Sequence, residues 1–282
     1  MKNSMLESKY RLLVLIDQTK SSYTALRNAV NLAKVIDAGI EVFYVKPPLQ
    51  VVRYDNQIAV MRTLGEERIA SKKAMRKLVD TISDIENIPI IYSFTFGNVI
   101  TEIQNHITKT QPDVVVIGKR KPKMVNFLGD GLTSYLLKHH KGEILISGSD
   151  KNLTSYHDVS LGFLDDISLN NEVEIIQDLK KRTHKPFKLF KIKKTDSQLK
   201  KPITFSKPKE QSNVANTVIF EFEEGMDNSG SVSKYIEKNK LGLLCVKRET
   251  KQKLSKSIGL NDKAQQTINK TNVPVLILAN KK

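Results

Sequence analysis

The chain has 282 residues, which is long enough for two ordinary domains that each bury a core. Its hydrophobic content of 39% and its few glycines and prolines are typical of a folded globular protein and exclude a disordered one. No apolar run approaches the ~20 residues that span a bilayer, so the sequence predicts no membrane insertion and a cytoplasmic setting.

The formal net charge of +16 is high for an enzyme that acts on small neutral substrates. Such a charge is compatible with nucleic acid, anionic lipid or an acidic protein as a partner, or with a lysine-rich solvated surface. The basic residues are spread through both halves, and the aromatic residues fall inside apolar runs instead of alternating with basic ones. This distribution favours a solvated surface and leaves nucleic-acid binding as an alternative.

The first half of the chain alternates strand-like and helix-like segments. The run RLLVLID has the length of a strand and ends on Asp17, and PDVVVIG is a continuous β-branched run, typical of a strand covered on both faces. Asn98 is predicted to cap a helix. In chain order we predict strand 11–17, helix 21–36, strand 40–45, a long amphipathic helix through 64–82, strand 88–97, a helix after Asn98, strand 112–118, a short helix from about Gly131 and strand 143–147.

The second half repeats this order with one substitution. A polar segment broken by prolines, 193–213, stands where the first half has its long helix. The other predicted elements are strand 159–166, helix 170–181, strand 187–192, strand 216–225, helix 231–240, strand 241–248 and strand 274–280. Cys245 lies inside one of these apolar strands, and we interpret it as a buried small hydrophobic residue.

The repeated order predicts a tandem protein with a boundary near 148–156, and therefore domains at 1–150 and 151–282. Strands that alternate with helices imply βαβ units and a parallel sheet. The predicted fold class is α/β: two tandem flavodoxin-like, Rossmann-like units, each a five-stranded parallel sheet flanked by helices.

Two stretches of the first half resemble the universal stress protein family, namely LLVLIDQTKSSYTALRNAVNLAKVIDAGIEVFYVKPP and PDVVVIGKRKPKMVNFLGDGLTSYLLKHHKGEILI. The resemblance covers 10–147 and, through element order alone, 157–280. It implies the sheet order 3-2-1-4-5 and a binding and regulatory role in the stress response, without robust catalysis. Strands 1 and 4 are then neighbours, and their carboxyl ends form the crevice where ligands bind in open α/β sheets.

Members of this family that bind ATP carry Gly-x-x-Gly, nine residues and then Gly-Ser or Gly-Thr. Glycines let backbone N–H groups approach phosphate oxygens, and the helix N-terminus adds its dipole. Here the frame begins at Gly118 and resumes at Gly131, but Lys121 replaces the second glycine and Leu132 the hydroxyl residue, with Thr133 one place later. The resemblance therefore implies a degenerate nucleotide site.

The resemblance also assigns roles to other positions. Asp17 would contact the ribose or adenine side of a nucleotide, and three apolar residues would flank the base. The candidate nucleotide-binding residues are Leu15, Asp17, Val45, Ile117, Gly118, Lys121, Gly131, Leu132 and Thr133, and no catalytic residue or metal ligand is predicted.

Three functions stay open at this point. The first is a universal stress protein-like regulatory protein with weak or lost ATP binding. The second is a protein that binds ATP or another adenine nucleotide, with at most slow hydrolysis, in which Lys121 serves as a point-charge phosphate ligand. The third is an anion or nucleic-acid binder that uses the basic loop 119–123.

The second crevice is predicted to be closed by its own charges. Asp165 and Asp166 follow its first strand, while Lys247 and Arg248 stand where Gly118 stands in the first half. We expect these opposite charges to pair with each other rather than with a ligand.

The ends of the two units carry further expectations. His139 and His140 end a short helix, where we interpret them as cations that complement its dipole rather than as metal ligands. Members of the family commonly dimerise through the last strand, so the resemblance implies an internal pseudo-dimer in which 143–147 and 274–280 pair antiparallel, with a homo-oligomer as an open alternative.

Overall fold

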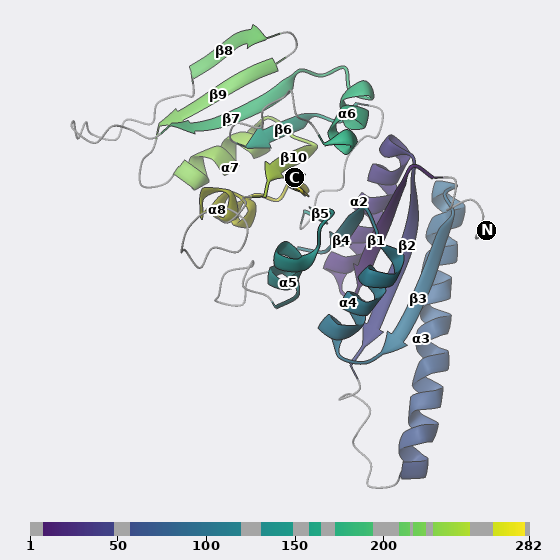
Figure 1. The fold of residues 1–282 in the computed structure, drawn as a ribbon. Coiled ribbons are helices and arrows are strands. Elements are labelled where there is room, and N and C mark those ends of the chain that lie inside the picture. The colour runs from purple at the N-terminus through teal and green to yellow at the C-terminus, as the bar shows by residue number, and fades with distance from the viewer. Residues whose placement is uncertain are drawn as a thin grey trace.

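The computed structural model describes residues 8–47, 57–119, 131–148, 158–164, 173–193, 209–214, 217–223, 228–248 and 262–279. In these ranges the strands form one 11-stranded sheet with helices on both faces (Figure 1). The strand order is β3-β2-β1-β4-β5-β11-β10-β6-β7-β9-β8. None of the described helices is both long and apolar enough to cross a bilayer.

The first half has the predicted sheet order, 3-2-1-4-5, with all neighbouring strands parallel. Asn98 caps α4, as its side chain accepts hydrogen bonds from the backbone N–H groups of Ile100 and Thr101. The elements are β1 (Tyr10–Ile16), α2 (Lys20–Ile36), β2 (Ala38–Lys46), α3 (Gln57–Glu86), β3 (Ile90–Phe96), α4 (Val99–Thr110), β4 (Val114–Ile117), α5 (Gly131–His139) and β5 (Glu143–Ile146).

The second half repeats this order and adds one strand. Part of the polar segment predicted at 193–213 forms β8, which pairs antiparallel with β9 at the outer edge of the sheet. The sequence did not predict this strand, because its residues, KEQSNV, are polar and lack strand periodicity. The elements are β6 (Leu161–Leu164), α6 (Glu174–Lys181), β7 (Phe187–Lys193), β8 (Lys209–Val214), β9 (Thr217–Glu223), α7 (Asn228–Lys238), β10 (Leu243–Lys247), α8 (Asp262–Lys270) and β11 (Val275–Leu278).

The two halves join through β5 and β11, which pair antiparallel at the centre of the sheet. Leu145 lies opposite Leu276, so this pair marks the middle of the junction. The antiparallel pairing of these two segments is the one that the sequence predicted. Because each strand covers the edge of the other, neither is open to further pairing.

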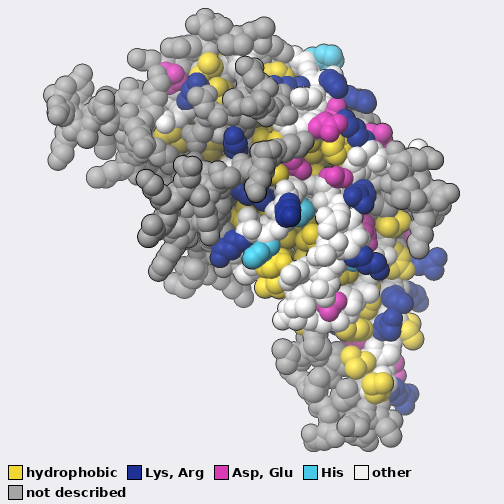
Figure 2. Space-filling model, viewed as in Figure 1, with side chains coloured by type: hydrophobic (Ala, Val, Ile, Leu, Met, Phe, Trp, Pro, Cys, Tyr) yellow, Lys and Arg dark blue, Asp and Glu magenta, His cyan; other side chains and the backbone are white. Residues whose placement is uncertain are grey.

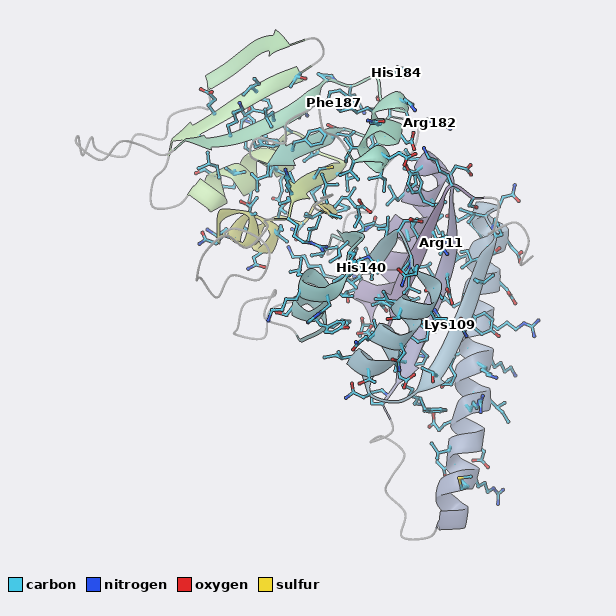
Figure 3. All side chains as sticks on the ribbon, viewed as in Figure 1. Arg11, Lys109, His140, Arg182, His184 and Phe187 are labelled. Atoms are coloured by element: carbon cyan, nitrogen blue, oxygen red, sulfur yellow. The ribbon has the colours of Figure 1, made fainter. Side chains whose placement is uncertain are left out.

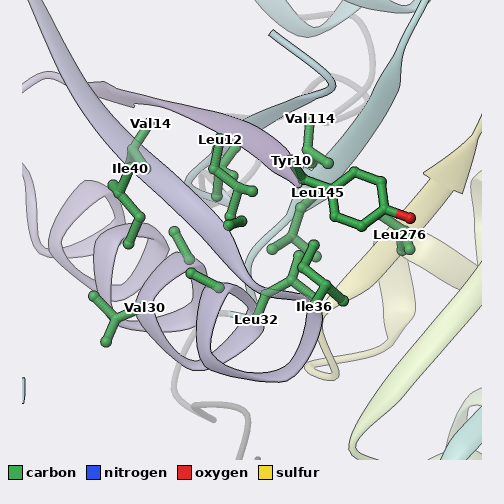
Figure 4. Close-up of a cluster of buried hydrophobic side chains, with 14 of the residues drawn as sticks. Tyr10, Leu12, Val14, Val30, Leu32, Ile36, Ile40, Val114, Leu145 and Leu276 are labelled. Atoms are coloured by element: carbon green, nitrogen blue, oxygen red, sulfur yellow. The ribbon is translucent and has the colours of Figure 1, made fainter. Parts of the chain in front are cut away.

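Two layers of apolar side chains cover the two faces of the sheet, and each runs across the junction. One layer packs α2, α3 and α6 against the sheet, and Figure 4 shows part of it, with Leu145 of β5 and Leu276 of β11 in the same cluster. The other layer packs α4, α5, α7 and α8 against the opposite face. The halves therefore share continuous cores, in addition to one pair of strands.

Candidate functional site

A cleft of about 390 Å³ opens at the carboxyl ends of β1, β2 and β4. The first turns of α2, α4 and α5 complete its wall. This is the crevice of the sheet where the strand order reverses, the place at which open α/β sheets bind ligands. The lining residues are Leu15, Ile16, Asp17, Gln18, Ser21, Ser22, Phe43, Tyr44, Val45, Pro47, Val99, Ile103, Ile117, Gly118, Leu132 and Thr133.

The structure brings most of the residues predicted for the nucleotide site to this cleft. Gly131 is the first residue of α5 and does not belong to the lining. A Cβ atom there would lie at an ordinary 3.7 Å from Ile100, so the protein fold itself does not require this glycine. Lys121 lies outside the described residues. The predicted residues that line the cleft are Leu15, Asp17, Val45, Ile117, Gly118, Leu132 and Thr133.

Asp17 helps to build the turn from β1 into α2. Its Oδ1 atom accepts hydrogen bonds from the backbone N–H and the hydroxyl of Thr19, at 3.1 Å and 2.5 Å. Thr19 is the N-cap of α2 and accepts from the backbone N–H of Ser22. The Asp17 side chain is exposed to solvent, and the residue belongs to the lining of the cleft.

Gly118 ends β4 against the first turn of α2. A Cβ atom at this position would lie 2.6 Å from the carbonyl carbon and oxygen of Ser21 and 2.9 Å from the nitrogen of Ser22. Cβ atoms essentially never come within 3.0 Å of a non-bonded heavy atom, so any other residue would push the strand end and the helix apart. The resemblance implies that this glycine lets a phosphate approach, and the structure shows that it also lets the first turn of α2 approach.

A partly buried polar cluster contacts Phe43 in the apolar wall of the cleft. The ring of Phe43 stacks on His106, with 4.0 Å between ring centroids. His106 Nε2 lies 2.9 Å from Glu41 Oε1, and Ser93 donates to the same oxygen at 2.5 Å. Burial alone would raise the pKa of Glu41, but the hydrogen bonds with His106 and Ser93 outweigh burial and lower it. The cluster holds Phe43 in place through α4.

The sequence did not point to several lining residues. Phe43 and Tyr44 sit near the end of β2, where only Val45 was predicted. Val99 and Ile103 come from α4, and Asn98 was the signal that could have revealed them, because a helix that starts there begins beside the same sheet edge. Burial raises the pKa of Tyr44, whose ring is almost fully covered.

The expectation of a solvated or ligand-binding basic loop at 119–123 is wrong for Lys119. Its ammonium donates to backbone carbonyl oxygens of the second half, those of Ile268, Asn269 and Thr271. Burial lowers the pKa of Lys119 to about 8, while Glu237 nearby opposes that shift. The rest of this loop, 120–123, lies outside the described residues.

Arg248 also differs from its predicted role. Its guanidinium donates to the carbonyl oxygens of His140 and Gly142, in the first half, and burial lowers its pKa. Asp165 and Asp166, its predicted partners, lie outside the described residues. The pairing expected in the second crevice therefore stays a prediction, and Arg248 makes a contact across the junction that the sequence did not predict.

His140 and Cys245 are both buried at or near the junction. Figure 3 shows His140 where the two halves meet. Burial, followed by the charge of Arg248, lowers the pKa of His140 to about 4, so this imidazole is neutral and the dipole interpretation is wrong for it. Burial also raises the pKa of the Cys245 thiol, in agreement with the predicted buried hydrophobic residue.

The described surface has a mixed character. Figure 2 shows Lys and Arg side chains scattered among acidic and apolar ones on the visible face. Among the described residues, no group of three or more His, Cys, Asp and Glu side chains could hold a metal ion.

An open α/β sheet with a ligand-sized cleft at its switch point places this protein in the flavodoxin-like class of α/β folds. Residues 10–147 match the model of the universal stress protein family. We therefore assign this part of the chain to the universal stress protein family. No curated protein sequence matches the chain.

Solved structures extend the likeness over both halves. A universal stress protein from Archaeoglobus fulgidus DSM 4304 is 13% identical, with a TM-score of 0.67 and 98% of each chain covered. A putative universal stress protein from Pseudomonas aeruginosa UCBPP-PA14 is 12% identical, with a TM-score of 0.59, covering 95% of this chain and 92% of that one. At these identities the likeness shows a shared fold alone.

Proposed function

We propose that this protein is a universal stress protein-like regulatory protein whose first domain, 1–150, binds an adenine nucleotide weakly. The observation that carries the proposal is the cleft, where seven of the nine predicted residues come together. Its volume of about 390 Å³ falls in the range of small-molecule sites. Apolar side chains suit the faces of a purine, and the Asp17 carboxylate suits ribose hydroxyls.

The described lining suits a nucleoside better than a triphosphate. It contains one carboxylate, Asp17, and neither Lys nor Arg. Leu132 stands where the family frame has a hydroxyl, and Lys119 is engaged by the second half. Charge that develops on phosphate oxygens would find no cation in this lining, so we expect no efficient hydrolysis.

The second domain, 151–282, has a structural role in this proposal. We interpret the β5–β11 pair as an internal pseudo-dimer contact, which joins two related units of one chain. Arg248 fits such a role, because it is bound to the backbone of the first half rather than directed at a crevice of its own.

Isothermal titration of the full chain with ATP and with adenosine tests the proposal. We expect both to bind, with little gain from the three phosphates. Val99→Trp places a large ring in the cleft and should abolish binding of both ligands. Ile69→Trp, at an exposed position of α3 that is 70% accessible, is the matched control and should bind as the wild type does. Absence of binding by the wild type, or unchanged binding by Val99→Trp, would refute the proposal.

A further inference from the structure

Two basic side chains cross the junction in opposite directions. The Nζ atom of Lys119, which follows β4, donates to the carbonyl oxygens of Ile268 at 2.8 Å, Asn269 at 3.1 Å and Thr271. These carbonyls belong to the last turn of α8 and the residue that follows it. In the opposite direction, Arg248 follows β10 and donates to the carbonyls beyond α5.

The two basic residues occupy the same place in their halves. Val114 and Leu243 correspond, since each begins its strand and pairs with the equivalent first strand. Lys119 and Arg248 each follow five residues later. Corresponding positions thus make corresponding contacts, each with the other half.

Their targets correspond as well. Ile144 and Val275 are equivalent, because each pairs with the second residue of its neighbouring strand, β4 or β10. His140 and Thr271 each precede these residues by four positions. The carbonyl of His140 accepts from Arg248, and that of Thr271 accepts from Lys119. The contact is therefore reciprocal about the junction.

Helix ends are suited to such contacts. The last carbonyls of a helix have no partner within the helix and carry partial negative charge, which a cation satisfies. Lys119 is half-buried, and Arg248 is largely covered as well, so water competes poorly for these carbonyls. Each half thus supplies the C-terminal cap for a helix of the other half.

Both contacts are made by elements that also line the proposed ligand cleft. Gly118, which lines the cleft, is bonded covalently to Lys119. Leu132 and Thr133 line the cleft from the first turn of α5, and the opposite end of this helix, about 10 Å away, meets Arg248. One side of the cleft, formed by β4 and α5, is consequently held at two points by the second half.

We infer that Lys119 and Arg248 are positioning residues that couple the first-domain cleft to the second domain. Ligand in the cleft stabilises the arrangement of β4 and α5 in which both caps form, and the caps in turn stabilise the ligand-binding arrangement, since such coupling is reciprocal. The coupling rests on the proposed function, because its ligand is the adenine nucleotide proposed above. The second domain then regulates binding in the first.

Titration and hydrogen exchange on the full chain test the coupling. Lys119→Met and Arg248→Met keep an unbranched apolar stem and remove the charged group, and Lys72→Met, an exposed lysine of α3, is the matched control. In the wild type, ATP should slow exchange in the cleft and also at the end of α8. In Lys119→Met, ATP should bind about fivefold more weakly, and the effect on α8 should disappear. Arg248→Gln, which removes the charge but keeps a polar group, replaces Arg248→Met if the latter fails to fold.

The outcomes separate this coupling from the proposed function. Binding within about twofold of the wild type in both variants, with the effect on α8 retained, would overturn the coupling and leave the nucleotide site intact. If the wild type binds no ATP, the proposed function fails. Hydrogen exchange measured without ligand then tests whether the second domain is coupled to the cleft. Lys119→Met must then accelerate exchange at the cleft residues of β4 and α5 as well as in α8, and acceleration confined to α8 would overturn the coupling.

Discussion

The two halves are built with the same order of strands and differ where the fourth strand ends. In the first half Gly118 lies against the backbone of Ser21, so α2 begins in direct contact with the strand end. In the second half the same place holds Lys247, which is exposed. The first helix is 17 residues long in the first half and 8 in the second. The two halves therefore share the order of their strands, whereas the close approach that Gly118 permits is a feature of the first half's crevice.

The connection between the second and third strands shows a larger difference. The first half uses α3, a helix of 30 residues that extends past the end of the sheet in Figure 1. The second half has β8, which adds an antiparallel strand to the outer edge. Neither change affects the order of the five parallel strands, because α3 contacts the outer strand β3 and β8 pairs with the outer strand β9.

One added methyl group should disrupt the close contact between Gly118 and the first turn of α2. Gly118→Ala should lower the free energy of unfolding by about 3 kcal/mol, because the new Cβ atom would overlap the backbone of Ser21. Gly65→Ala in α3 is the control: nothing lies within 4 Å of its Cβ position, and it should raise that free energy by about 0.5–1 kcal/mol. Urea denaturation measures both. Similar effects of the two substitutions would show that the approach of α2 is not decisive.

The equivalent positions His140 and Thr271 differ in whether they can titrate. The folded-state pKa of His140, about 4, lies below its ordinary value of 6.5, so the unfolded chain binds more protons between these values. Stability is complete above pH 6.5 and is lost as the pH falls towards 4. We expect a loss of about 2 kcal/mol between pH 7 and pH 5.

Substitution separates the pH dependence due to His140 from that due to carboxyl groups and to other imidazoles. His140→Leu should remove most of the loss between pH 7 and pH 5, because the unfolded chain then has no imidazole at this position to take up a proton. His139→Leu, at the exposed neighbouring position, should retain it. Denaturation curves recorded across this pH range provide the measurement, and a slope unchanged by His140→Leu would contradict the assignment.

The first helices of the two halves differ in their caps. Thr19 supplies a side-chain cap to α2, whereas Val173 at the start of α6 makes no such hydrogen bond. Thr19→Ala should lower the free energy of unfolding by about 1 kcal/mol. Val173→Thr adds the missing hydroxyl and should raise it by about 0.5 kcal/mol. Thermal or chemical denaturation resolves both signs, and a loss of stability in Val173→Thr would show that apolar packing outweighs the cap.

The smallest effect is expected at the centre of the sheet. Cys245 of β10 occupies the position that Val116 occupies in β4, and both are fully buried. Cys245→Val should change the free energy of unfolding by less than about 1 kcal/mol. In the wild type, a thiol reagent should react with Cys245 only after denaturant is added, because burial raises the pKa of the thiol. Rapid labelling of the native protein would contradict this environment.

Much of the fold could be predicted because its signals are local. Buried parallel strands such as 112–118 appear as continuous apolar runs, and their alternation with helical periods indicates βαβ units. The junction was also accessible, since the resemblance implied pairing through the last strand. The edge strand β8 was not, because a polar strand at an edge depends on its partner rather than on its own periodicity.

The candidate site was predictable in part for a related reason. Asp17 and Gly118 end strands that the sheet order makes neighbours, so sequence and topology together bring them to one cleft. The roles of Lys119 and Arg248 were missed, because their partners are backbone carbonyls about 150 and 110 residues away in the sequence. Carbonyl groups are present at every residue, so no pattern of side chains marks them as targets.

The pairing of β5 with β11 within a single polypeptide has a consequence for dilution and for divergence. Two separate chains joined through such strands would come apart at low concentration, whereas here the partner strand is tethered, and the junction re-forms at a rate that does not depend on protein concentration. The tether also frees the two sides from being identical. One side can use a lysine for its contact across the junction while the other uses an arginine, which a symmetric pair of identical chains cannot do.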